Sequence, residues 1–169
     1  KGRIIDLLYV FRLEDRILVI TSYEARKEVC EWIEFYKIME DVSVEDKSDQ
    51  LGHHRLTGTG TIDLFPQLTN LESLQIKEIT LGSVPCLAFL PDIKALPAID
   101  FLVPSEFTDE FRKYWMDRTN VISSDAFDYM RILSGIPVYG RELTTKFNPL
   151  EAGLIRYISF NKGCYIGQE

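Results

Sequence analysis

The sequence predicts an α+β fold, because patterns typical of β-hairpins are combined with patterns typical of amphipathic helices. Two pairs of apolar runs, each pair interrupted by a short turn, lie within residues 4–20 and 76–90 and indicate antiparallel hairpins. Three segments with apolar residues at helical spacing begin near Ser22, Pro104 and Ser124. Together these patterns predict antiparallel sheets with packed helices.

Composition limits the classes of partner. The 169 residues are 46% hydrophobic, which is ample for a core, and the formal net charge of -7 disfavours broad binding to nucleic acid or to an anionic membrane. The chain has no apolar run near the roughly 20 residues that span a bilayer and no signal-peptide pattern at its start, so we expect a cytoplasmic protein. Three widely spaced cysteines fit neither a disulfide framework nor a metal site.

The first hairpin is expected between residues 4–13 and 17–20, followed by a helix with Ser22 as its N-cap and with Trp32 and Tyr36 in the core. The polar stretch 46–50 is the expected lobe boundary. It separates residues 1–46, part of a first lobe, from a second lobe over residues 47–169. Elements are expected to continue beyond both ends.

The middle of the chain offers few chemical groups. His53 and His54 are neighbours on a predicted strand, so they should point to opposite faces and not share a metal ion. The glycine turn at 58–60 is not a nucleotide site, because Asp63 replaces the third glycine of the dinucleotide fingerprint. In the hairpin of residues 76–81 and 84–90, Cys86 lies in an apolar strand and is expected to be inert.

Two charged residues stand out against apolar surroundings. Asp100 lies alone in the apolar strand 99–103, where it is either an outward-facing polar residue or a ligand contact at a pocket wall. Arg131 lies at the margin of a helical apolar stripe, which comprises Ala126, Tyr129, Met130 and Leu133. The loop that follows is rich in glycine and proline, as expected where backbone lines a site.

The last residues, 157–169, contain a β-type run that ends at a glycine-flanked cysteine, Cys164. Lys162 and the expected N-terminus of a following helix favour the thiolate, which predicts a reactive thiol. The alternative is that Cys164 only begins that helix, and that the glycines on either side mark the boundaries of the element.

Residues 162–169, Lys-Gly-Cys-Tyr-Ile-Gly-Gln-Glu, resemble the signature octapeptide of YgfZ-type folate-binding proteins, relatives of the glycine-cleavage T-protein. Residues 135–143 and 149–154 are similar to loops of the same family, and residues 4–13 are similar more loosely to its strand with paired aspartates. The resemblance implies a T-protein-like fold around a central folate cavity, with tetrahydrofolate or a derivative as cofactor.

The resemblance also implies roles for individual residues. Asp6 matches the first aspartate of the pair, Asp100 the glutamate at the pteridine edge, and Arg131 the arginine at the glutamate tail. Tyr139 lies in the folate loop, and Cys164 with Lys162 forms the working motif. No residue is expected to bind a metal ion.

The function implied is a folate-binding accessory factor that supports assembly or repair of iron–sulfur clusters in client enzymes, including those of tRNA modification. A tetrahydrofolate-dependent one-carbon transferase like the aminomethyltransferases is the alternative, and a folate-free interaction module is the third. Leu7 replaces the second aspartate and offers no proton acceptor, so glycine-cleavage activity is not expected.

Overall fold

The computed structural model describes residues 2–93 and 96–163, which form two compact units. Within the described residues, the first unit comprises 2–10, 18–46 and 137–163, and the second comprises 11–17 and 47–136. Residues 137–163 cluster with the N-terminal segment in the first unit. Ile4 explains this return: it packs with Leu143 and Leu154 in a small buried cluster.

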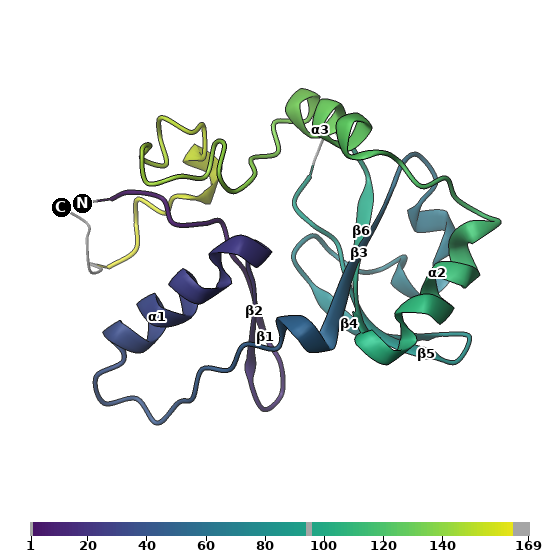
Figure 1. Ribbon diagram of the computed structural model, residues 1–169, viewed down its shortest axis with the longest axis horizontal. Coiled ribbons are helices and arrows are strands. Elements are labelled where there is room, and N and C mark those ends of the chain that lie inside the picture. Colours follow the sequence, from purple (N-terminus) through teal and green to yellow (C-terminus); the bar gives the residue numbers. More distant parts are fainter. Residues whose placement is uncertain (1, 94–95, 164–169) are drawn as a thin grey trace. The chain divides into compact units, whose positions relative to one another are not determined.

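The first unit holds most of a hairpin and the longest helix (Figure 1). β1 (Tyr9–Arg12) and β2 (Ile17–Ile20) pair in a two-stranded sheet, which confirms the first hairpin with a shorter first strand. A 3-10 turn, Tyr23–Ala25, leads into α1 (Arg26–Tyr36). The prediction that Trp32 is a core residue is wrong, since 51% of it is exposed and its ring packs on that of Tyr36.

The second unit is built on a four-stranded antiparallel sheet in the order β3-β6-β5-β4. The strands are β3 (Leu51–Thr57), β4 (Ile76–Leu81), β5 (Val84–Phe89) and β6 (Ala98–Pro104). β4 and β5 confirm the second predicted hairpin. Their turn requires Gly82, whose φ of 64° is unfavourable for residues with a side chain.

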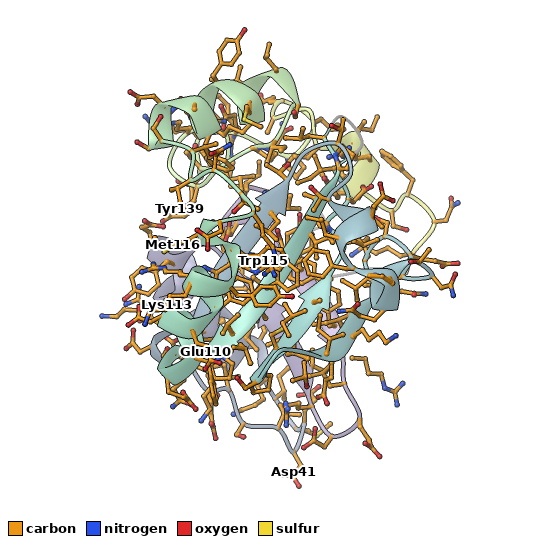
Figure 2. All side chains as sticks on the ribbon, turned by 90° about the vertical axis from the view of Figure 1, so that its right-hand side faces the viewer. Asp41, Glu110, Lys113, Trp115, Met116 and Tyr139 are labelled. Carbon is orange, nitrogen blue, oxygen red and sulfur yellow. The ribbon has the colours of Figure 1, made fainter. Side chains whose placement is uncertain are left out.

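One face of this sheet carries the main hydrophobic core. α2 (Thr108–Met116) covers that face and buries Phe111 against Phe101 of β6 and Trp115 against Phe65. Figure 2 shows Trp115 pointing from α2 towards the sheet, whereas Lys113 points outward. Short 3-10 helices accompany these elements at Ser48–Gln50, Ile62–Leu64, Pro66–Leu68 and Ser105–Phe107.

α3 (Ser124–Leu133) begins with Ser123, whose hydroxyl accepts a hydrogen bond from the Ala126 amide. Its predicted apolar stripe is wrong: 67% of Tyr129 and 69% of Leu133 are exposed, and the buried residue of this helix is Arg131. Arg131 is buried through polar contacts, because its guanidinium donates hydrogen bonds to Asp128 of the same helix and to the Ile136 carbonyl after it.

The C-terminal part of the described chain is irregular. The β-type run expected at residues 157–160 is not a strand, and a 3-10 helix, Ile155–Tyr157, occupies its beginning. Phe160 is largely exposed, so no sheet takes up its side chain. Across residues 2–93 and 96–163, no helix has the length and apolarity needed to cross a bilayer.

Candidate functional site

Asp100 lies in the middle of the sheet of the second unit, with Arg55 of β3 opposite it on one side and Phe89 of β5 on the other. The carboxylate is fully buried. Arg55 donates two hydrogen bonds to it, Nε to Oδ1 at 2.6 Å and Nη2 to Oδ2 at 2.7 Å. His53 Nε2 lies 3.1 Å from Oδ2. Both carboxylate oxygens are therefore engaged by side chains of the neighbouring strand.

The protonation of Asp100 follows from these contacts. Burial raises the pKa of the carboxyl group, but the hydrogen bonds from Arg55 and His53 outweigh this effect, so the pKa lies below its ordinary value. Asp100 is thus a buried anion held by a bidentate guanidinium. The expectation of an outward-facing polar residue is wrong.

The side chains of His53 and His54 point to opposite faces of the sheet, as the alternation of side chains along a strand predicts. The face that carries the Asp100 side chain also carries every second residue of β3, namely His53, Arg55 and Thr57. His54 points to the opposite face, where its ring lies 4.9 Å from that of Phe111. Burial, with the nearby positive charge of Arg112, lowers the pKa of His54.

Arg131 is buried at the end of α3, not at a polar margin as expected. Its Nε donates to Asp128 Oδ1 at 2.6 Å, and its Nη1 donates to the Ile136 carbonyl at 3.2 Å. The guanidinium therefore connects the last turns of α3 to the loop that follows Gly135. A charged, buried side chain with fixed acceptors is well oriented for binding.

A pocket in the second unit brings Arg131 together with Arg55. Its polar lining is Arg55, Thr57 and Arg131, and the rest of its lining is apolar, from Ile93, Leu96, Phe127, Met130 and Ile136. The volume of about 10 Å³ is at the lower limit of what holds a single water molecule. Asp100, the hydrogen-bond partner of Arg55, is not among the lining residues.

Asp6 has its own network in the first unit. Its Oδ2 accepts hydrogen bonds from Thr21 Oγ1 and from the Ser22 amide, both at 2.6 Å, and its Oδ1 accepts one from Ser22 Oγ at 3.0 Å. The expected N-cap Ser22 thus makes no side-chain capping bond and donates to Asp6 instead. These bonds tie the segment before β1 to the connection between β2 and α1.

Leu7, next in the chain, packs against the small cluster of Ile4, Leu143 and Leu154. Tyr139 lies in the loop that supplies Leu143 and forms an isolated β-bridge with it. That loop turns at Gly140, whose φ is 79°, and Glu142 accepts a hydrogen bond from the Val138 amide at 3.1 Å. Asp6 and Tyr139 therefore belong to the first unit, whereas Asp100 and Arg131 belong to the second.

Of the motif at the end of the chain, Lys162 is described and exposed, while Cys164 lies outside the described residues. Cys30 and Cys86 form no disulfide. The pKa of Cys30 is raised by burial and by the charge of Asp46, and burial raises the pKa of Cys86 to about 11. The part of the chain that is described contains no cluster of three or more residues suited to metal binding.

Sequence reasoning did not identify Arg55 or His53 as site residues. The available signal was two basic or titratable residues, His53 and Arg55, at alternate positions of one strand. Their partner Asp100 is 45 residues away, and only the pairing of β3 with β6 joins them.

No protein-family model matches the chain. Over its whole length the chain is 23% identical to an aminomethyltransferase of Thermoanaerobacter sp. and covers 49% of that protein. It is 27% identical, over 99% of its length, to an aminomethyltransferase of Chlorobium limicola, of which it covers 50%. It has the same identity, again over 99% of its length, to a putative chloroplastic transferase of Arabidopsis thaliana, of which it covers 40%.

The chain thus spans about half the length, or less, of these curated relatives. The similarity extends across both units and is not confined to one motif. The chain is therefore a distant homologue of the aminomethyltransferase, or T-protein, family.

Proposed function

We propose that this chain is part of a protein that binds a reduced folate, tetrahydrofolate or a derivative, and supports the assembly or repair of iron–sulfur clusters in client enzymes. The distant homology to aminomethyltransferases supports the folate part of this proposal. The cluster part is supported by the resemblance of residues 162–169 to the YgfZ-type octapeptide.

The hydrogen bonds of Asp6 are the observation that favours a folate-binding protein over a transferase. Its carboxylate accepts three hydrogen bonds from Thr21 and Ser22, and the neighbouring Leu7 packs into an apolar cluster. Proton transfer at a folate nitrogen needs an acceptor within hydrogen-bond reach of that nitrogen. Asp6 connects the segment before β1 to the chain after β2, and Leu7 has no proton acceptor, so we propose that this segment supplies folate-binding surface rather than acid–base chemistry.

The proposed folate contacts are Arg131, Asp100, Asp6 and Tyr139, with Arg131 bound to the tail carboxylate. Arg131 lines the pocket of the second unit, and its fork is held by Asp128 and the Ile136 carbonyl. A planar guanidinium with fixed orientation matches the geometry of a carboxylate.

The proposed working group for cluster support is Cys164, with Lys162 favouring its thiolate. Burial and raised pKa make Cys86 a poor nucleophile, and Cys30 also has a raised pKa. Chemistry that needs a thiolate therefore falls to Cys164.

The second candidate is a one-carbon transferase acting on tetrahydrofolate, favoured by the aminomethyltransferases among the relatives. Under this alternative the full-length protein would release ammonia from an aminomethylated carrier when tetrahydrofolate is added. Under the proposal it binds folate without this turnover.

Calorimetric titration of the full-length protein with 5-formyltetrahydrofolate tests the proposal. We expect saturable binding, weakened about ten- to a hundredfold in Arg131→Ala, because a charged hydrogen bond contributes roughly 1.5–3 kcal/mol. A cell-based assay of iron–sulfur enzyme activity should show loss of support in Cys164→Ala. Efficient aminomethyl turnover would select the alternative, and absence of folate binding would reject both.

A further inference from the structure

We propose that the outer side of α1 and the segment after it bind a basic, amphipathic helical segment of a partner protein. We name this surface the α1 face; it consists of Glu28, Glu31, Trp32 and Phe35 of the helix and of Ile38 and Met39 beyond its end. The inference goes beyond the proposed function and does not depend on folate binding.

The first unit packs against the other side of α1. Val29, Ile33 and Tyr36 follow one another at intervals of four and three residues, so they lie on one side of the helix. Val29 is buried and the other two are half-buried, which identifies this side as the inner one. An ordinary surface helix would carry only polar residues opposite such a side.

The outer side of α1 carries two large aromatic residues instead. Trp32 and Phe35 are three positions apart, and 51% of Trp32 and 76% of Phe35 are exposed. Their ring centroids lie 4.8 and 4.9 Å from that of Tyr36, so both rings rest on an ordered neighbour. Ordered, exposed aromatic side chains of this kind are typical of the energetic centre of a protein interface.

The segment after the helix extends the apolar surface. Ile38 is 80% exposed and Met39 is 91% exposed. The Glu40 carboxylate accepts hydrogen bonds from the Ile38 amide at 2.9 Å and from the Met39 amide at 3.1 Å, which fixes the local backbone. Residues 32–39 therefore present four large apolar side chains to solvent, a concentration that marks interaction sites on soluble proteins.

The charge around the α1 face is strongly negative. Residues 24–46 contain eight acidic and three basic residues, a net charge of -5 within a chain of net charge -7. Arg26 pairs with Asp46, and Lys37 pairs with Glu34. Of the remaining acidic residues, Glu28 and Glu31 are exposed, and neither forms an ion pair with a residue that the structure describes.

This charge decides which partner the α1 face takes. Glu28 and Glu31 lie one turn apart on the same side of α1 as Trp32 and Phe35, because the four positions are spaced as i, i+3, i+4 and i+7. Like charges at this spacing repel each other, and a basic partner relieves that repulsion. Lysine and arginine also bind the faces of aromatic rings, so a basic amphipathic segment complements both components.

A second copy of the chain is a poor occupant for the same reason. Pairing two α1 faces would bring four unpaired carboxylates together, two from each copy, and juxtaposed like charges weaken an interface. An acidic or neutral apolar segment would match the aromatic residues but not the carboxylates. The surface therefore selects a partner that carries both apolar and basic side chains.

The experiment titrates the full-length protein by calorimetry with a helical peptide of about 18 residues, built from leucine and lysine so that one side is apolar and the other basic. The control peptide has glutamate in place of every lysine. We expect the lysine peptide to bind at least about tenfold more tightly than the glutamate peptide, and the difference to shrink at about 0.5 M salt. Equal affinity of the two peptides would overturn the inference.

Variants locate the binding surface. Phe35→Ala, and separately Glu28→Gln combined with Glu31→Gln, should each weaken binding of the lysine peptide at least about tenfold. Phe160→Ala is the matched control, since this phenylalanine of the same unit is 72% exposed and lies outside the α1 face. All these side chains are exposed, so thermal midpoints should stay at the wild-type value. Unchanged affinity in Phe35→Ala, or an equal loss in Phe160→Ala, would contradict the assignment.

Two further measurements distinguish the other possible occupants. The thiol introduced by Phe35→Cys should be labelled rapidly in the folded full-length protein, as followed by peptide mapping. Protection until unfolding would show that the remainder of the polypeptide covers the α1 face, which overturns the inference. So would self-association in sedimentation equilibrium that Phe35→Ala abolishes, because a second copy would then be the occupant. No readout involves folate, so failure of the proposed function leaves these outcomes unaffected.

Discussion

Arg55 and Asp100 face each other across β3 and β6 and form a side-on ion pair with hydrogen bonds of 2.6 and 2.7 Å. The two residues are unequal in burial, since the Asp100 side chain is fully buried and 23% of the Arg55 side chain is exposed. The buried Asp100 carboxylate has no water to solvate its charge and therefore needs the Arg55 guanidinium, whereas the partly exposed Arg55 is also solvated by water.

Arg55→Ala should lower the free energy of unfolding by about 3 kcal/mol, because it removes the guanidinium that pairs with a buried carboxylate. Urea unfolding followed by circular dichroism measures the change. The control is Arg16→Ala, which breaks an exposed Arg–Asp pair in the hairpin turn and should cost less than about 1 kcal/mol. Equal losses in the two variants would contradict the importance of burial at Asp100.

His54 should make stability fall as the pH drops below 6.5. Burial lowers its pKa, so the unfolded chain takes up a proton at this position at a higher pH than the folded chain does. The stability from the neutral folded imidazole is complete above the ordinary histidine pKa of 6.5 and is lost as the pH falls towards the lower pKa of the folded state. The slope contributed is at most about 1.4 kcal/mol per pH unit.

His54→Phe keeps the ring contact with Phe111 and removes the titration. Unfolding free energies measured between pH 7.5 and 5 should therefore depend less on pH in this variant than in the wild type. The chain has two histidines, so the variant leaves His53 as its control. An identical pH dependence in both proteins would show that His54 is not the titrating group.

Asp6→Ala should destabilise the protein by about 2 kcal/mol, since it removes the acceptor of three hydrogen bonds in a half-buried setting. Urea unfolding measures this, with the exposed Asp15→Ala in the hairpin turn as the control, which should be nearly neutral. If Asp6→Ala left stability unchanged and only abolished folate binding, the structural role of this carboxylate would be excluded.

Cys164 should be alkylated faster than Cys30 and Cys86, and Cys86 should be the slowest. A pKa of about 11 gives Cys86 roughly 300-fold less thiolate than a free cysteine of pKa about 8.5 near neutral pH, and burial also restricts access. Peptide-mapped iodoacetamide kinetics at pH 7.5 give the three rates. Faster modification of Cys86 than of Cys164 would contradict the assignment of the reactive thiol.

Local sequence patterns determined the elements of this protein. Apolar runs on either side of Gly82 specified the β4–β5 hairpin, and serines at helix starts with glycine beyond helix ends specified α3. The alternation of a strand also predicted that His53 and His54 point to opposite faces. These features depend on residues a few positions apart, so they can be recognised without the fold.

The tertiary structure alone decided which charged residues meet. Arg55 and Asp100 are 45 residues apart in the chain and pair because β6 lies between β3 and β5 in the sheet. Arg131 is buried although its helix places apolar residues at the surface, because acceptors from Asp128 and Ile136 surround its guanidinium. Likewise, residues 137–163 return to the N-terminal unit through contacts of Ile4.

The physical reason is the range of the interactions. Backbone preference and side-chain alternation act over one or two turns, and the sequence by itself determined the hairpins, the helices and the distant homology to aminomethyltransferases. Desolvation and charge pairing depend on neighbours brought together from distant parts of the chain. The fold therefore decided that Asp100 is a buried partner of Arg55, and that Arg55 and Arg131 line one pocket.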